Sequence, residues 1–279
     1  MLYLPRMEQR MKRIKKGGFE GGAYLDTGTG FPLVLVHGFP ADHRLWAHQI
    51  RQLQEQYRLI CPDLPGTGSS PLAEPLKIAD MARFILAILD QENIASCIVI
   101  GHSMGGYATL ALAEQQPERL AGWGLFHSSA YADDETRKIG RKRSIEMMKT
   151  YGQEGFLRQM LPTLFSAAFR KAHRTAVESL IQERVAAGID ALIPYYHAMW
   201  ERPDRTQVLR DARVPVLFVI GKEDVAAPMD RVLEQVHLPP VSTVHLLADT
   251  GHLGMLEKPD TATQILAQFS AFCLQGRQD

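Results

Sequence analysis

Six short apolar runs, most of them rich in β-branched residues, recur along the chain and are separated by segments with a helical pattern. The runs lie at 33–36 (LVLV), 58–61 (RLIC), 97–101 (CIVIG), 121–127 (AGWGLFH), 214–221 (VPVLFVIG) and 242–248 (STVHLLA). The segments between them, such as 79–89 and 264–272, carry apolar residues at helical spacing. Such alternation is typical of a parallel sheet covered by helices on both faces. The sequence therefore predicts an α/β fold with a doubly wound, mostly parallel sheet.

One interval breaks this alternation. More than eighty residues separate the run that ends near His127 from the run that begins near Val214. Crossover loops normally take only about 2–6 residues on each side of their helix. The interval contains apolar stripes at helical spacing, and we interpret residues 131–205 as an inserted helical cap. The predicted core is then 23–130 together with 206–279, and residues 1–22 are expected to be a poorly ordered N-terminal extension.

Charge and composition limit the classes of partner. The 31 lysines and arginines are matched by 31 aspartates and glutamates, so no overall field attracts nucleic acid or an anionic membrane. No run of about 18 apolar residues is present, and no apolar stretch of signal-peptide length follows the basic N-terminus. Three cysteines without framework spacing favour a reducing compartment, and we expect a cytoplasmic location. The expected partner is a small-molecule substrate, and the oligomeric state stays open.

The run at 97–101 leads directly into His102-Ser103-Met104-Gly105-Gly106 and then into a segment of small residues. The pattern G-x-S-x-G is weak alone, since it arises by chance in roughly one chain of this length in ten. A strand before it and a helix after it make it specific, because such a turn exposes the serine at the carboxyl edge of the sheet. We predict that Ser103 is a nucleophile. The alternative is a simple glycine-rich turn.

A serine hydroxyl needs an adjacent base, and histidine is the usual one. Of ten histidines, His252 follows the last predicted strand by a few residues, where a loop would carry it over the carboxyl edge. The orienting acid is expected after another strand and between the serine and the histidine in the chain. Asp224 meets this condition, with Glu223 and Asp249 as rivals. His37 and His102 are interpreted as structural or rim residues, and His127 as a residue that lines the pocket.

An oxyanion formed beside Ser103 needs two N–H donors. The amide of Met104 is the first candidate, because it begins the helix that follows the serine. The second donor is expected in the loop after the run at 33–36, where His37-Gly38-Phe39-Pro40 stands. Pro40 has no N–H, so we predict the amide of Phe39.

The sequence resembles the α/β-hydrolase family in HGFP (37–40), DLPGTGSS (63–70), GHSMGG (101–106), GKED (221–224) and GHLGMLEKP (251–259), which occur in this order across the core. The resemblance implies a Ser103, Asp224 and His252 triad, with the amides of Phe39 and Met104 as the oxyanion hole. It also implies a helical lid after the sixth strand. Family members with an aspartate nucleophile, the haloalkane dehalogenases and epoxide hydrolases, are excluded because this chain has a serine.

The expected activity is that of a carboxylesterase-like serine hydrolase, which cleaves a small ester-like substrate through an acyl-enzyme without a metal or organic cofactor. Tyr196 and Trp200 of the cap are expected to bind substrate, although both could simply pack the cap onto the core. The same triad would also serve a carbon–carbon bond hydrolase, a thioesterase, a lactonase or a perhydrolase. A ligand-binding member of the fold with little turnover is the alternative from another class.

Overall fold

The computed structural model describes residues 11–72, 75–188 and 191–275. Eight strands form one sheet in the order β1-β2-β4-β3-β5-β6-β7-β8. Their bounds are β1 Met11–Arg13, β2 Ala23–Thr27, β3 Phe31–Val36, β4 Tyr57–Pro62, β5 Cys97–His102, β6 Leu120–Phe126, β7 Val216–Gly221 and β8 Ser242–Leu247. The six strands from β3 to β8 pair in parallel, whereas β1 and β2 are antiparallel additions at one edge. The predicted α/β fold with a mostly parallel sheet is confirmed.

Each of the six predicted runs corresponds to one of the parallel strands. β1 and β2 were not predicted, because neither is a continuous β-branched run. The expectation of a poorly ordered N-terminal extension is wrong for residues 11–22. Met11, Lys12 and Arg13 pair with Leu25, Tyr24 and Ala23, so this part of the chain belongs to the sheet. The first ten residues of that extension lie outside the described residues.

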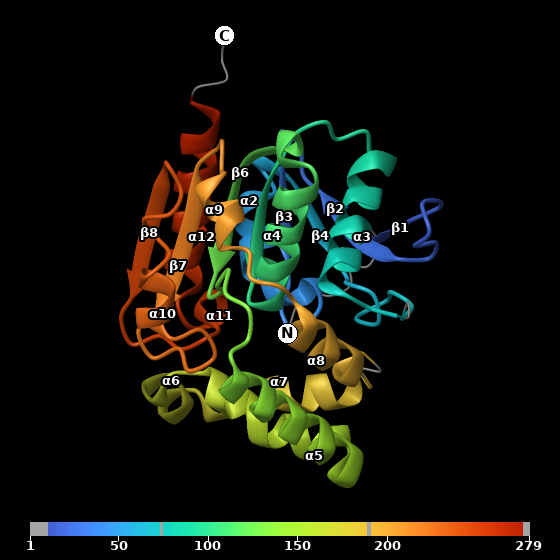
Figure 1. Cartoon of the computed structure of the whole chain (residues 1–279), viewed down its shortest axis with the longest axis vertical. Helices are drawn as coiled ribbons and strands as arrows, with labels where there is room; N and C mark the ends of the chain where they lie inside the picture. Colours follow the sequence, from blue (N-terminus) through green and yellow to red (C-terminus); the bar gives the residue numbers. More distant parts are fainter. Residues whose placement is uncertain (1–10, 73–74, 189–190, 276–279) are drawn as a thin grey trace.

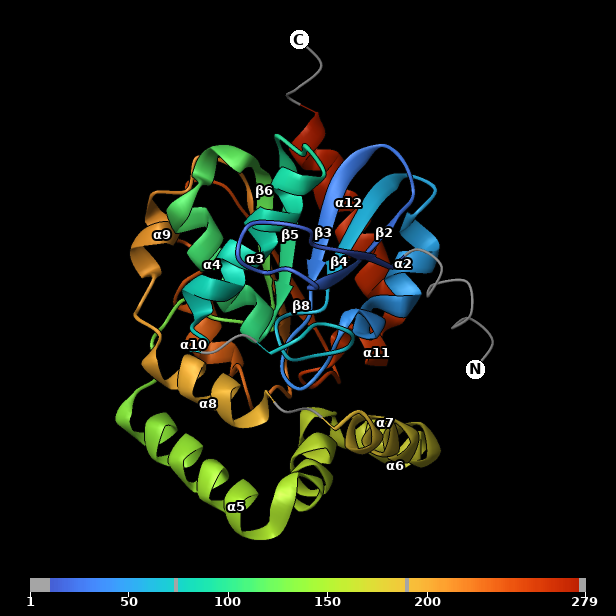
Figure 2. The same cartoon turned by 90° about the vertical axis from the view of Figure 1, so that its right-hand side faces the viewer.

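Helices cover both faces of the sheet. Their bounds in the core are α2 Ala47–Leu53, α3 Ile78–Gln91, α4 Met104–Gln115, α9 Thr206–Arg210, α10 Met229–Leu233, α11 Gly254–Glu257 and α12 Pro259–Leu274, with 3₁₀ turns η1 His43–Trp46 and η2 Pro117–Arg119. Helices α3 and α4 pack side by side on one face, and α2 and α12 on the other (Figure 2). The central strands are therefore buried on both faces, which explains why they are continuously apolar.

In the described residues between β6 and α9 there are four helices, α5 Glu135–Met160, α6 Ala167–Ala172, α7 Arg174–Ala186 and α8 Leu192–Glu201, with the 3₁₀ turn η3 Leu161–Leu164. They gather at the end of the molecule that faces the carboxyl ends of the parallel strands (Figure 1). Gly152 divides α5 with a φ of 78°, a left-handed conformation that glycine adopts without steric cost. We keep the name cap for residues 131–205.

In the part of the chain that the structure describes, none of the helices combines the length and apolar character that crossing a membrane requires.

Candidate active site

Ser103 lies between the last residue of β5 and the first residue of α4. Its backbone has φ 51° and ψ −116°, a left-handed conformation that is rare for residues other than glycine and that stores strain. The turn is tight, since a Cβ built on Gly105 would come within 2.6 Å of the carbonyl oxygens of Val36 and His37. Such a turn lifts the serine side chain out of the helix and strand backbones, and Ser103 keeps partial solvent exposure.

Asp224 and His252 lie against each other. The Nδ1 atom of His252 is 2.8 Å from Oδ2 and 3.0 Å from Oδ1 of Asp224. Asp224 follows β7 in a turn in which Oδ1 accepts hydrogen bonds from the amides of Ala226 and Ala227, each 2.8 Å long. The carboxylate can only accept, so His252 presents its proton at Nδ1 and keeps a lone pair on Nε2.

The surroundings of Asp224 keep its side chain ionised. Burial alone would raise the pKa of this carboxyl, but the charge and hydrogen bonds of His252 and His127 outweigh burial and hold the pKa well below its usual range. Within the described part of the chain, neither rival forms a hydrogen bond or an ion pair with His252. The carboxylate of Glu223 accepts the amide of Ala167 at 3.0 Å, and Asp249 is an exposed residue in a turn with φ 48°.

The strand order brings Ser103 and His252 to the same edge. Ser103 follows β5, Asp224 follows β7 and His252 follows β8. Strands β5 to β8 are parallel neighbours in the sheet, so the residues that follow them lie at the same, carboxyl edge. His102, which precedes the serine, has its ring centroid 4.9 Å from that of His252, and its Nε2 lies 2.9 Å from the carbonyl oxygen of His252. His102 thus anchors the backbone of the His252 loop, in keeping with the structural role expected for it.

The predicted oxyanion loop approaches the serine closely. A Cβ built on Gly38 would lie 2.9 Å from Cβ of Ser103 and 2.6 Å from Nδ1 of His102, so only glycine fits there. Phe39, the next residue of this loop, is buried. Met104 is the first residue of α4, and its amide therefore has no acceptor within that helix. Met104 therefore adjoins Ser103 in the chain, and Phe39 follows the glycine that approaches Ser103.

His37 has the structural role that the sequence suggested. Its Nδ1 faces the carbonyl of Gly38 at 2.9 Å, and its Nε2 accepts the amide of Leu64 at 3.0 Å. The ring is fully buried, and burial lowers its pKa. His37 therefore holds the oxyanion loop against the turn that begins at Leu64.

The side chain of His127 is fully buried, whereas the sequence suggested that it lines the pocket. The residue is buried, its Nδ1 lies 3.2 Å from Oδ2 of Asp224, and its Nε2 accepts the amide of Gly254 at 3.3 Å. The ring therefore stands behind the acid. Its position at the end of a strand could not distinguish a ring that faces substrate from one that faces a neighbouring strand.

The two cap residues that were predicted to bind substrate, Tyr196 and Trp200, have different surroundings. The ring of Tyr196 packs edge-on against that of Phe39, with centroids 5.0 Å apart, so Tyr196 stands beside the oxyanion loop. Trp200, one turn further along α8, stacks on His197 with an interplanar angle of 11°. His197 is exposed, so Trp200 packs on the solvent-facing side of α8.

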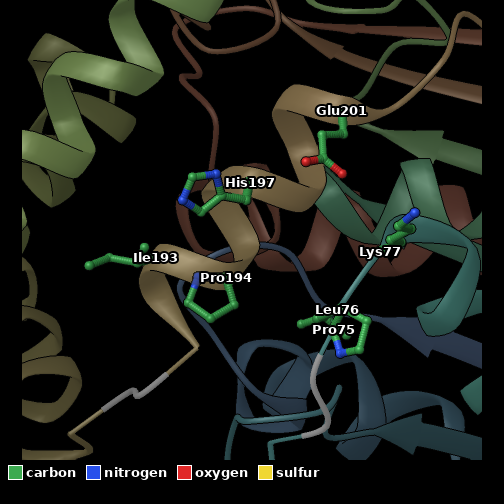
Figure 3. Close-up of a pocket in the computed structure, with 7 residues that line it drawn as sticks. All are labelled: Pro75, Leu76, Lys77, Ile193, Pro194, His197 and Glu201. Atoms are coloured by element: carbon green, nitrogen blue, oxygen red, sulfur yellow. The ribbon is translucent and has the colours of Figure 1, made fainter.

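A pocket of about 530 Å³ opens on that solvent-facing side (Figure 3). It lies between α8 and the segment that precedes α3, and it does not include Ser103, Asp224 or His252. Its lining residues are Pro75, Leu76, Lys77, Ile193, Pro194, His197 and Glu201.

Asp42, His43 and Asp63 form a compact group whose ligand-type atoms lie within 4.8 Å of one another. Arg184 donates a hydrogen bond to Asp42 at 2.7 Å, and Arg44 donates one at 2.6 Å. The Nδ1 atom of His43 is hydrogen-bonded to Oδ1 of Asp63 at 2.6 Å. The carboxylates are thus engaged by cationic and imidazole donors, and we interpret the group as an ion-pair network. The sequence analysis missed it, because Asp42 and Arg184 are 142 positions apart and only the fold brings them together.

Most of the chain is similar to known proteins. The model of the family described as "Alpha/beta hydrolase family" matches residues 33–263. A 2-hydroxy-6-oxononadienedioate/2-hydroxy-6-oxononatrienedioate hydrolase of Burkholderia vietnamiensis is 28% identical over 265 residues, which cover 88% of this chain and 89% of that protein. Among solved structures, a thermophilic esterase from Thermogutta terrifontis (malate bound) has a TM-score of 0.85 and 29% identity, covering 90% of this chain and 94% of the other.

Another relative is longer than this chain. The dihydrolipoyllysine-residue acetyltransferase component of the acetoin cleaving system of Cupriavidus necator is 29% identical over 257 residues. The match covers 87% of this chain but only 64% of that protein, so the chain corresponds to part of the relative's length.

Proposed function

This chain belongs to the alpha/beta hydrolase family, and from that premise we propose that it is a serine hydrolase that cleaves a small carboxylic ester through an acyl-enzyme. In this proposal Ser103 is the nucleophile, His252 the base and Asp224 the acid that orients the base. One observation carries the proposal: Nδ1 of His252 lies 2.8 Å from Oδ2 of Asp224, which accepts its hydrogen bond. This pair lies at the edge of the sheet at which Ser103 occupies a strained turn.

The proposed reaction begins when Nε2 of His252 takes the hydroxyl proton of Ser103. The Oγ atom then forms a bond to the ester carbonyl carbon, and His252 returns the proton to the leaving alcohol as the ester C–O bond breaks. Water repeats the sequence on the acyl-enzyme and releases the carboxylic acid and Ser103. Asp224 stays ionised throughout, because its depressed pKa keeps it a carboxylate that stabilises the imidazolium.

The negative charge on the carbonyl oxygen needs donors that are already in place. The amides of Phe39 and Met104 are proposed for this task. No backbone acceptor engages either amide in the described ranges, and the Met104 amide also lies at the positive end of α4. In this proposal one amide comes from the loop after β3 and the other from the first residue of α4.

An aromatic cluster supports a mostly apolar substrate. The ring of Phe39 contacts three rings of the cap, those of Phe156, Tyr195 and Tyr196, with centroids 5.0–6.4 Å apart. We therefore propose Tyr196 as a substrate-binding residue, and we no longer propose Trp200 or His127 for this role. The same catalytic residues would serve a carbon–carbon bond hydrolase, a thioesterase or a perhydrolase, and a substrate panel separates these reactions.

The direct test uses a fluorophosphonate probe, which labels an activated serine. We expect labelling of the folded wild type and none of Ser103→Ala, whose kcat on p-nitrophenyl esters should fall by on the order of 10⁶. The series of acyl lengths then measures the size of the pocket. Absence of labelling in folded wild type would overturn the proposal and favour a ligand-binding member of the fold.

The proposed mechanism uses only side chains and backbone amides of this chain, so it calls for neither a metal nor an organic cofactor. The cytoplasmic location remains a prediction that rests on the three cysteines, and a small molecule remains the proposed partner.

A further inference from the structure

The cap and the loop that carries His252 are joined through their backbones. The amide of His252 donates a 2.7 Å hydrogen bond to the carbonyl of Leu164, which ends η3 in the cap. The two segments approach so closely that a Cβ on Gly251 would come within 2.6 Å of the same carbonyl oxygen and 2.7 Å of the amide nitrogen of Ser166. The base is therefore held by a contact outside the core.

Glu257 completes this junction. It is the last residue of α11, and its side chain is buried. One carboxylate oxygen accepts the amide of Gly251 and the other accepts the amide of Ser166, each at 3.0 Å. A carboxylate is an acceptor only, so it satisfies one donor from the base loop and one from the cap at the same time.

The side chain of the acid is held from the core. The cap contacts only the neighbours of Asp224: Arg137 donates to the carbonyl of Ala226 at 3.1 Å, and the carboxylate of Glu223 accepts the amide of Ala167. Asp224 is held by the amides of Ala226 and Ala227 and faces His127, all of which belong to the core. The carbonyl of His252 is likewise held from the core side, by His102. Among the residues that the structure describes, the amide of His252 is thus the group of the proposed triad that hydrogen-bonds directly to the cap.

We propose that Glu257 is a positioning residue that ties residues 164–166 of the cap to the loop of His252, so that the base is correctly placed for Ser103 only while this part of the cap is docked. The inference rests on the proposed function, since it assigns Glu257 an effect on the base of that reaction. A displacement of about 1 Å in such a group costs on the order of 10²-fold in rate. A change in the junction therefore acts on rate more than on binding.

The first experiment compares Glu257→Gln with Glu223→Gln. Glutamine at 257 presents an NH₂ group to one of the two amides, so one hydrogen bond is lost while size is kept. Glu223 is the matched control: its carboxylate also accepts a cap amide, that of Ala167, at 3.0 Å. Its contact with the base loop is made by its backbone amide, which donates to the carbonyl of Thr250 at 2.9 Å and is kept in the variant. We expect Glu257→Gln to lower kcat and the rate constant of fluorophosphonate labelling together, by about 10–100-fold, with KM little changed. Glu223→Gln should stay near wild type.

Labelling separates position from folding. The final extent of labelling counts folded molecules, whereas the rate constant reports the competence of the base. A positioning role predicts full extent at a reduced rate, and a merely structural role predicts reduced extent at the wild-type rate.

A second pair of variants removes the same hydrogen bond from the cap side. Ser166 has φ −59° and Phe165 before it is extended, so proline fits the backbone dihedrals at 166. The substitution removes the N–H and, with it, the serine hydroxyl. Ser166→Ala is the control, because it loses the hydroxyl that caps α6 but keeps the amide. We expect slow labelling for the proline variant and wild-type labelling for the alanine variant, also in the event that Glu257→Gln does not fold.

Equal labelling rates for wild type, Glu257→Gln and Ser166→Pro would overturn the positioning role and leave the proposed function intact. Equal loss in Glu257→Gln and Glu223→Gln would also overturn it, since the effect would not depend on the base loop. A folded wild type that is not labelled at all would overturn the proposed function and this inference together.

Discussion

Arg184 of the cap donates a 2.7 Å hydrogen bond from Nη1 to Oδ2 of Asp42 in the loop that also carries Phe39, and both side chains are almost fully buried. The guanidinium lowers the pKa of the Asp42 carboxyl well below its usual range, although burial alone would raise it. The cap therefore holds the oxyanion loop as well as the base loop. The contact joins residues from distant parts of the chain through a pair of charges that water does not reach.

Removing one partner of this pair should be costly. In Arg184→Met the charge of Asp42 stays buried, and we expect the free energy of unfolding to fall by about 3 kcal/mol, the lower end for a broken buried pair because Arg44 still engages Asp42. Urea unfolding of the two proteins measures the difference. The control is Arg158→Met, whose partner Glu154 is exposed, and no measurable change is expected there. Similar stabilities for wild type and Arg184→Met would show that the pair does not hold the cap.

His127 should matter to rate through Asp224. His127→Asn keeps a donor near the position of Nδ1 and tolerates the left-handed backbone of φ 52°, whereas His127→Leu does neither. A hydrogen bond to a charged group contributes about 1.5–3 kcal/mol, so we expect kcat to fall at least about tenfold in the leucine variant and distinctly less in the asparagine variant. Steady-state kinetics on one ester decides. Identical kcat values in the two variants would contradict a role for the donor.

Gly38→Ala should damage the oxyanion loop without removing any polar group. The new Cβ would meet Nδ1 of His102 at 2.6 Å and Cβ of Ser103 at 2.9 Å, so the loop must move away from the serine. The loss of one oxyanion donor costs about 10²–10³ in kcat, and we expect a loss of this order. Gly140→Ala is the control, because a Cβ there meets nothing within 4 Å. Wild-type kcat in Gly38→Ala would argue against the assignment of the loop.

Buried histidines should make the protein less stable in mild acid. Burial lowers the pKa of His37, His102 and His127, so these rings stay neutral in the folded chain while the unfolded chain takes up protons near pH 6.5. The free energy of unfolding should therefore fall as pH drops below about 6.5, by up to about 1.4 kcal/mol per pH unit for each ring.

Urea unfolding between pH 7.5 and 5.5 measures this slope. The depressed pKa values of Asp42 and Asp224 act at lower pH, where the unfolded chain protonates carboxylates, so this window isolates the histidines. His102→Gln keeps a donor for the carbonyl of His252 and should reduce the slope. A wild-type stability that does not change across the window would contradict the prediction.

The sequence by itself determined the parallel sheet and the places where Ser103, Asp224 and His252 would stand. A strand buried on both faces must be continuously apolar, and a turn such as GHSMGG needs glycines on both sides, so both leave a local pattern. Asp224 was favoured over Glu223 and Asp249 by its position after a strand and by the resemblance to the family, and the structure places it against His252. Strands β1 and β2 left no such pattern and were missed.

Tertiary structure decided the orientation of side chains and the contacts between distant segments. His127 stands at a strand end as predicted, but only the packing of β6 beside β7 turns its ring toward Asp224. Trp200 and Tyr196 lie one helical turn apart, and the side on which each ring packs depends on the neighbours that α8 meets. The junctions of Arg184 with Asp42 and of Glu257 with Ser166 span 142 and 91 positions. Hydrogen bonds over such separations depend on three-dimensional proximity, which no local sequence pattern encodes.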